Sequence, residues 1–123
     1  MVDDDNTFER TIYHRDYNED KKDNINTFPT DPAVFGIFAI MHDKPMNCRY
    51  IGETDNLRLG VKELFEKAGE VSPGLAQFMQ GEWIKMLVYE PMPGVSREDR
   101  QKKVEEWIKK YNPKCNDKGE YRK

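Results

Sequence analysis

The sequence predicts a small α+β domain in which helices flank a three-stranded antiparallel sheet, with the elements in the order β-β-α-α-β-α. Two apolar segments that lie close together are separated by a polar stretch, which is typical of a hairpin. Two longer segments repeat apolar residues at helical spacing. A third apolar segment lies between these helical segments, and 123 residues suffice for one domain with one core.

The expected hairpin joins strands at 34–41 and 48–53. The first strand is apolar without alternation from Phe35 onward. For a run this short, that pattern favours a strand that is covered on both faces and is therefore central in the sheet. Residues 42–47 are polar, so we expect them to form the turn.

Long helices are expected at 56–68 and 96–111, with a shorter helix at 73–80 between them. Ser96 provides an N-cap oxygen for the last helix. A third strand at 82–89 ends before the next prolines, because proline cannot donate to a strand ladder. The residues expected in the core are Phe35, Ile37, Ala39, Ile51, Leu57, Val61, Leu64, Ile84, Val104 and Ile108.

The two ends of the chain differ in charge. Residues 1–35 contain nine acidic and four basic residues and few aliphatic ones. This composition predicts an acidic N-terminal arm at 1–30 that is poorly ordered or loosely docked, followed by a single domain at 31–123. From Arg97 onward the balance reverses, with ten basic and six acidic residues.

Several classes of protein are disfavoured by the sequence. No apolar run approaches the roughly 20 residues of a membrane span, so we expect no membrane partner. The first residues lack the features of a signal peptide, which predicts a cytoplasmic protein. Cys48 and Cys115 are too few for a disulfide scaffold or a zinc site, and His14 and His42 lack a nearby second ligand. We therefore expect neither a metal site nor a cofactor from these residues.

Two tripeptides carry a family resemblance. Gly36-Ile37-Phe38 lies on the first strand of the expected hairpin, and Tyr50-Ile51-Gly52 lies on the second. The residues from Tyr50 to Arg58 lead from the expected second strand into the helix expected at 56–68. Pro113-Lys114-Cys115-Asn116 follows the last expected helix. In this order and spacing, residues 33–116 resemble the GIY-YIG nucleases, which implies their α+β fold. An active member would be a DNA endonuclease that depends on Mg²⁺ or Mn²⁺.

The resemblance also implies catalytic positions, and most of them are substituted here. The family has a tyrosine in each tripeptide, an arginine ten residues after the second tyrosine, and a glutamate on the last helix. Tyr50 is retained, whereas Phe38 replaces the first tyrosine. Gly60 stands at the arginine position and Val104 at the glutamate position. The chain therefore lacks the groups that would activate water, stabilise the phosphate charge and hold a metal.

These losses predict a domain that no longer hydrolyses phosphodiesters and acts as a binding module associated with nucleic acid, with DNA as the implied partner. The candidate contact residues are Arg58, Lys62, Lys102, Lys109 and Asn116. One alternative is an active metal-dependent endonuclease with a rearranged site. Its candidate catalytic residues are Tyr50, Arg58 and Glu105, with Glu105 as the metal ligand. A second alternative is a protein-interaction or inhibitory module whose acidic N-terminal arm mimics or competes with nucleic acid. The lysines and glutamates of the last helix alternate in sign, which also fits a solvated helix face that binds no phosphate.

Overall fold

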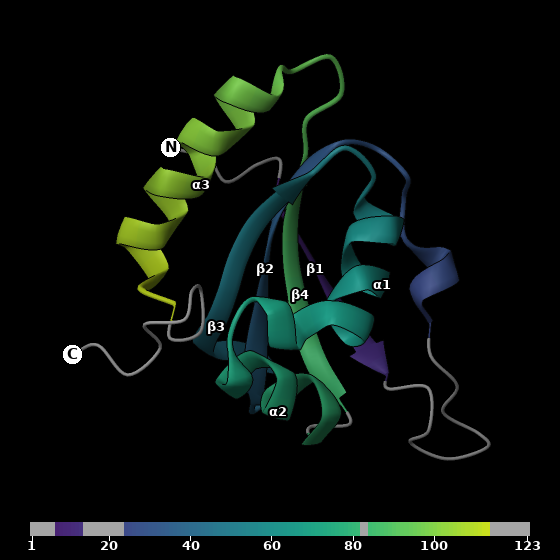
Figure 1. Ribbon diagram of the computed structural model, residues 1–123, viewed down its shortest axis with the longest axis vertical. Coiled ribbons are helices and arrows are strands. Elements are labelled where there is room, and N and C mark those ends of the chain that lie inside the picture. Colours follow the sequence, from purple (N-terminus) through teal and green to yellow (C-terminus); the bar gives the residue numbers. More distant parts are fainter. Residues whose placement is uncertain (1–6, 14–23, 82–83, 114–123) are drawn as a thin grey trace.

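The computed structural model describes residues 7–13, 24–81 and 84–113. In this part of the chain, a four-stranded antiparallel sheet lies between two layers of helices (Figure 1). The strands are β1 (Phe8–Tyr13), β2 (Ala33–Met41), β3 (Lys44–Thr54) and β4 (Ile84–Pro91). The α-helices are α1 (Leu57–Lys67), α2 (Pro73–Gly81) and α3 (Arg97–Tyr111), and the short 3-10 helices are η2 (Ile25–Thr27) and η3 (Ala68–Glu70).

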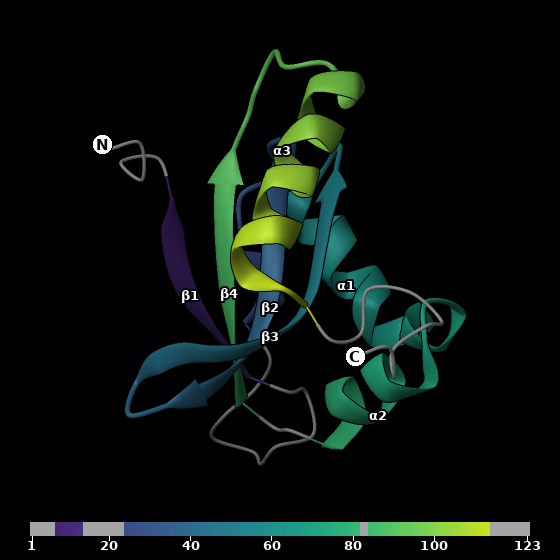
Figure 2. The ribbon, with the colours of Figure 1, turned by 90° about the vertical axis from the view of Figure 1, so that its left-hand side faces the viewer.

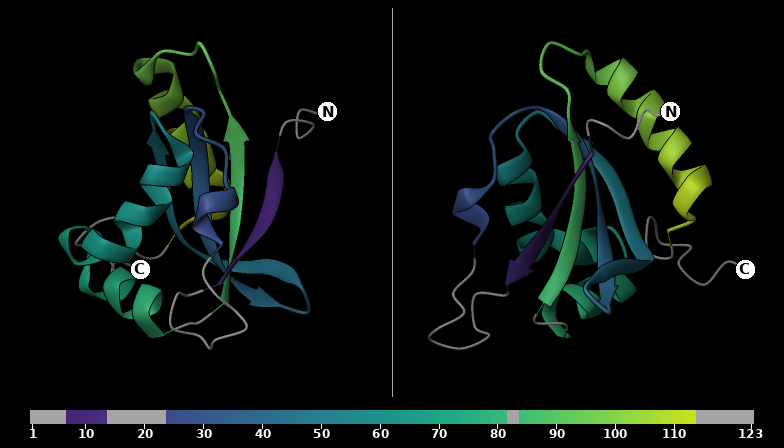
Figure 3. Two further views of the ribbon diagram at one scale, coloured as in Figure 1. Left: turned by 90° about the vertical axis from the view of Figure 1, so that its right-hand side faces the viewer. Right: turned by 180° about the vertical axis from the view of Figure 1, so that it is seen from behind.

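The α+β class and the antiparallel sheet are confirmed, but the prediction of three strands is wrong. The sheet has four strands in the spatial order β1-β4-β2-β3, and a further strand precedes the predicted hairpin in the chain. This strand, β1, comes from the segment expected to form the acidic arm, and it pairs with β4 from Phe8↔Tyr89 to Tyr13↔Ile84 (Figure 3). It forms because Ile12 is fully buried in the core and the Phe8 ring lies against the Tyr89 ring, 5.6 Å between centroids. Residues 1–6 and 14–23 of the predicted arm lie outside the described residues.

The β2–β3 hairpin is longer and more bent than expected, because β3 begins at Lys44 and not at residue 48. Only His42 and Asp43 form the turn, both with positive φ, as in the tight turns that match the twist of a hairpin. The register between the strands shifts on both sides of Phe38, which leaves Asn47 and Arg49 as extra residues on β3. The end of the hairpin therefore bends away from the plane of the sheet (Figure 2).

The two faces of the sheet have separate cores. We call them the α1 face, which is covered by α1 and α2, and the α3 face, which is covered by α3 (Figures 1 and 2). Six residues predicted for the core are buried: Phe35, Ile37, Ile51, Leu57, Val61 and Leu64. The other four are half-buried: Ala39, Ile84, Val104 and Ile108. On the α3 face, Trp107 packs over the sheet together with Phe38 and Val88.

The helices begin where the sequence places capping residues. The Asn56 side chain accepts a hydrogen bond from the Leu59 N–H at the start of α1, at 3.1 Å. The Ser96 side chain accepts one from the Asp99 N–H at the start of α3, also at 3.1 Å. Each cap satisfies a backbone donor that has no partner within its helix. In the described part of the chain, no helix is long and apolar enough to cross a membrane.

Candidate functional site

Phe38 and Tyr50, the two residues that the resemblance aligns with the GIY-YIG tyrosines, lie on opposite faces of the sheet. Tyr50 on β3 pairs with Ile37 on β2, and Phe38 pairs with Cys48. Residues that are directly opposed in an antiparallel pair share a face, so Tyr50 lies on the α1 face and Phe38 on the α3 face. The Phe38 ring meets the Tyr111 ring edge to face, with centroids 5.1 Å apart.

The Tyr50 side chain is half-buried against its own strand and the ring of Phe35, with centroids 5.9 Å apart. Its hydroxyl would be only 2.6 Å from a Cβ atom at Gly52, so the ring occupies the space that the glycine leaves. Burial, and to a smaller extent the negative charge of Glu53, raises the pKa of the Tyr50 phenol above its ordinary value of 10.0. The phenol is therefore held in its protonated form and is a poor general base at neutral pH.

Gly60 lies on α1 beside Tyr50, at one side of a small hollow of about 210 Å³ that Glu63 and Lys67 also line. A Cβ atom at position 60 would be 2.9 Å from both Cβ and Oγ1 of Thr54. Real Cβ contacts are longer than this, so α1 approaches the end of β3 as closely as it does only because residue 60 is a glycine. The Thr54 side chain therefore closes position 60, which the resemblance aligns with the GIY-YIG arginine.

The other candidate catalytic residues are not brought together. Arg58 donates from Nε to the Phe28 carbonyl at 2.9 Å, and its side chain thereby ties the preceding loop to α1. Glu105 is exposed on α3, on the other side of the sheet. Val104, its neighbour, is half-buried against the core of the α3 face. The sheet therefore lies between Glu105 and the pair Tyr50 and Arg58.

The candidate nucleic-acid contacts do not share one surface either. Lys102 and Lys109 are exposed on α3, whereas Arg58 and Lys62 belong to α1 on the opposite face. The Lys102 ammonium lies 3.8 Å from the Asp99 carboxylate, so part of its charge is neutralised locally. Asn116 lies outside the described residues.

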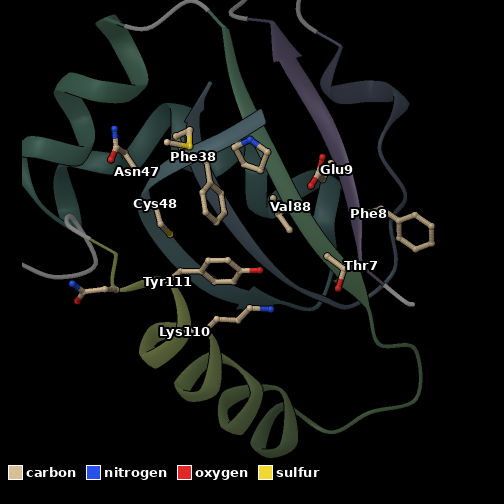
Figure 4. Close-up of a pocket in the computed structure, with 12 residues that line it drawn as sticks. Thr7, Phe8, Glu9, Phe38, Asn47, Cys48, Val88, Lys110 and Tyr111 are labelled. Carbon is tan, nitrogen blue, oxygen red and sulfur yellow. The ribbon is translucent and has the colours of Figure 1, made fainter. Parts of the chain in front are cut away.

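The structure reveals a groove on the α3 face, which we call the α3 groove (Figure 4). It has a volume of about 830 Å³. Helix α3 packs on β3 and β2, so β4 and β1 extend beyond it and form the base of the groove (Figure 2). The bent β2–β3 hairpin closes one end. The lining residues are Thr7, Phe8, Glu9, Phe38, Pro45, Met46, Asn47, Cys48, Val88, Lys110, Tyr111 and Asn112.

The lining of the α3 groove is apolar at its floor and charged at its sides. Phe38 and Val88 form the floor, and the Tyr111 ring projects over them (Figure 4). Glu9 belongs to the β1 wall and Lys110 to the α3 wall, where its ammonium lies 5.1 Å from the centroid of the Tyr111 ring. Two sides of opposite charge with an apolar surface between them suit an amphipathic ligand.

The groove continues along α3 past Trp107 as a smaller hollow of about 250 Å³. Lys103 on α3 and Glu90 on β4 also line this hollow, and they form an ion pair at 3.6 Å that joins its two walls. Sequence reasoning missed this whole site because it depends on β1. The sequence signal for that strand is that Phe8, Arg10 and Ile12 stand at every second position, as on one face of a strand. Three such residues, one of them charged, are too few to distinguish a strand from a charged arm.

Among the residues that the structure describes, no three His, Cys, Asp or Glu side chains come together as a ligand set for a metal ion. Comparison of the chain with protein-family models, with curated proteins and with solved structures finds no match.

Proposed function

We propose that this chain is a GIY-YIG-like domain that has lost phosphodiester hydrolysis and works as a binding module. The observation that carries the proposal is the placement of Phe38 and Tyr50 on opposite faces of the sheet. Hydrolysis needs a base, a cation and a metal-binding carboxylate around one phosphate. Residues divided between two faces of a sheet cannot surround one phosphate.

Three further features support the loss of hydrolysis. The raised pKa of Tyr50 disfavours its use as a base. The Arg58 guanidinium is engaged with the Phe28 carbonyl. Glu105 is separated from both by the sheet. A rearranged nuclease built on these three residues would need α3 and α1 to meet on one face, and the two helices cover different faces.

A nuclease assay tests the proposal. The full chain is incubated with single-stranded, duplex and branched DNA in the presence of Mg²⁺ or Mn²⁺. We expect no cleavage above that of the buffer. Cleavage that Tyr50→Phe or Glu105→Ala abolishes, while the exposed control Glu98→Ala retains it, would establish the rearranged nuclease instead.

A protein is the partner class that the surface supports best. The α3 groove has an apolar floor between walls of opposite charge, and protein segments can match both features. A polyanion would lie against Glu9 and Glu90 as well as against the lysines.

DNA is the second candidate partner, and the resemblance implies it. It is favoured by Lys102 and Lys109, which are exposed two turns apart on α3. A fluorescence titration with duplex DNA at several salt concentrations separates the two classes. A dissociation constant tighter than about 10⁻⁶ M with a steep salt dependence would favour DNA, and weaker binding would favour a protein.

A further inference from the structure

We infer that Arg49, at the bulge in β3, anchors a binding site for a carboxylate group of a partner protein. The inference rests on the proposed function as a binding module, and it names the anchor residue and the chemistry of the partner. It is carried by the guanidinium of Arg49, which lies over the Phe78 ring and has no hydrogen-bond acceptor among the residues that the structure describes.

The bulge in β3 places Arg49 on the α1 face of the sheet. Arg49 has no partner of its own on β2, because the register passes from Ile37↔Tyr50 to Phe38↔Cys48. In a bulge, two residues of one strand oppose a single residue of the other, so Arg49 and Tyr50 stand together opposite Ile37. The contact of Arg49 with Phe78 of α2 agrees with this placement, since α2 covers the α1 face. Bulges commonly redirect a side chain next to a functional site.

The Phe78 ring holds the guanidinium of Arg49 in place. The Cζ atom of Arg49 lies 5.0 Å from the centroid of the ring, which is a cation–π contact. Phe78 is 7% exposed and belongs to the core of the α1 face, so the ring is itself fixed by packing. A planar guanidinium that is already oriented loses less conformational entropy when it binds an acceptor.

The hydrogen-bond donors of Arg49 are unmatched. Its Nε is buried and has no acceptor in the described part of the chain. The side chain as a whole is half-buried, so the two terminal nitrogens are the donors that a ligand reaches.

The other described arginines each have an acceptor: Arg10 donates to Thr27, Arg58 to Phe28, Arg97 to Glu53, and Arg100 to Glu53 and Asp55. Arg49 is the exception among them. A charged donor without an acceptor is costly where water is partly excluded, and an oxyanion at the terminal nitrogens supplies that acceptor.

The surrounding charges favour one carboxylate over a polyanion. Nucleic acid is bound by several exposed cations that follow its phosphates. The basic residues of β3 are Arg49 and Lys44 alone. Lys85 lies 5.5 Å from the centroid of the same Phe78 ring but is fully buried, so a macromolecule in solvent does not reach it. A single acidic side chain needs only one guanidinium, whose planar fork matches both oxygens of a carboxylate.

Peptide selection with a counter-selection tests the inference. A displayed library of random dodecapeptides is selected on the immobilised full-length protein and depleted on the Arg49→Met variant, which removes peptides that bind elsewhere. The remaining peptides are synthesised and titrated by fluorescence anisotropy. We expect them to share an Asp or Glu, and we expect Arg49→Met to weaken their binding about tenfold, a change of about 1.4 kcal/mol.

A double-mutant cycle identifies the contact. Replacing the shared Asp or Glu of a peptide by Asn or Gln should weaken its binding to the unchanged protein about tenfold. The same replacement should change its binding to Arg49→Met by less than about twofold, because the two groups act as one pair. Arg49→Lys keeps the charge but not the planar fork, so its affinity should lie between those of the unchanged protein and Arg49→Met.

Two controls separate binding from a structural role. Lys109→Met removes a positive charge from an exposed position on α3, on the other face of the sheet, and should leave peptide binding within about twofold. Arg49→Met keeps an apolar cover over Phe78 and removes the buried Nε, so its urea midpoint should be unchanged or raised. A lowered midpoint with unchanged peptide affinity would mean that Arg49 serves the fold alone.

The inference is overturned if no peptide survives the counter-selection, or if the surviving peptides bind as well after their acidic residue is replaced. A single-stranded oligonucleotide whose affinity falls about tenfold with Arg49→Met, but not with Lys109→Met, would assign Arg49 to a phosphate instead. The nuclease assay separates this inference from the proposed function. Absence of both cleavage and peptide binding rejects this site alone, whereas cleavage rejects the proposed loss of hydrolysis.

Discussion

Arg100 of α3 donates from Nε to the Glu53 carboxylate at 2.8 Å, and this pair links the first turn of the last helix to the end of β3. The arginine is 4% exposed. It also binds the Asp55 carboxylate and donates to the Val95 carbonyl at 2.9 Å. Arg97 contacts the same Glu53 carboxylate at 3.2 Å. The orientation of α3, and with it one wall of the α3 groove, therefore depends on a charge pair that is almost excluded from water.

Replacing the buried arginine should destabilise the fold. Arg100→Ala removes a partner of Glu53, whose side chain is only 14% exposed. It also removes the hydrogen bond to the part-buried Val95 carbonyl. We expect the free energy of unfolding in urea to fall by about 3 kcal/mol. The control Lys102→Ala, two residues along the helix and 76% exposed, should change it by less than about 0.5 kcal/mol. Equal effects of the two substitutions would mean that the charge pair does not hold α3.

The raised pKa of Tyr50 predicts an alkaline dependence of stability. The unfolded chain loses the Tyr50 proton near pH 10.0, whereas the folded chain keeps it to higher pH. The contribution of Tyr50 is therefore complete below pH 10.0 and is lost as pH rises through the folded pKa. Unfolding free energies measured by urea titration from pH 8 to 11.5 should fall less steeply for Tyr50→Phe above about pH 10. The two proteins should show parallel curves below about pH 9, and parallel curves throughout would contradict the assigned pKa shift.

Among the elements that the structure describes, the sequence predicts three of the four strands and all three α-helices, because each of them has an apolar pattern long enough to be recognised without tertiary information. The strand β1 escapes prediction because its six residues contain only Phe8 and Ile12 as large apolar side chains on the covered face, and their burial depends on β4, more than 70 residues away. Local propensity carries no information on such a long-range pair.

The candidate site was predictable only in part. The substitutions at Phe38, Gly60 and Val104 are visible in the sequence, but the separation of Phe38 from Tyr50 is not. It arises from the extra residues of β3, and a one-residue change of register moves a side chain to the other face. In the sequence, Arg100 stands out only as part of the basic chain end, because its burial depends on Glu53 and Asp55 in a distant strand and loop.

The contribution of β1 to the fold can be tested by truncating its buried residue. Ile12 is fully buried among residues of the α1 face. Ile12→Ala should lower the free energy of unfolding by about 2 to 5 kcal/mol, as for other large-to-small core substitutions. Phe8→Ala on the same strand should cost about 1 kcal/mol, because Phe8 is 48% exposed and contributes one ring contact with Tyr89. If Ile12→Ala costs no more than Phe8→Ala, β1 is not part of the cooperative unit in solution.

Gly60 allows a prediction that runs against helix propensity. An alanine in a helix interior is ordinarily about 1 kcal/mol more favourable than a glycine. At position 60, however, the added Cβ would lie 2.9 Å from the Cβ of Thr54, an atom fixed to the backbone at the end of β3. Either α1 or the end of β3 must then shift, so we expect Gly60→Ala to lower the free energy of unfolding by about 1 to 3 kcal/mol.

The matched control for Gly60→Ala is Gly69→Ala, since a Cβ there would meet only the Ala76 Cβ at an ordinary 3.8 Å. We expect this control to leave the urea midpoint unchanged or slightly raised.

The larger substitution Gly60→Arg should destabilise the fold further. Consequently, the triple variant Phe38→Tyr, Gly60→Arg and Val104→Glu should remain inactive against DNA, because the restored groups would still be divided between two faces of the sheet. A stabilising effect of Gly60→Ala would show that α1 does not approach Thr54 this closely, and metal-dependent cleavage by a folded triple variant would show that the restored groups can meet.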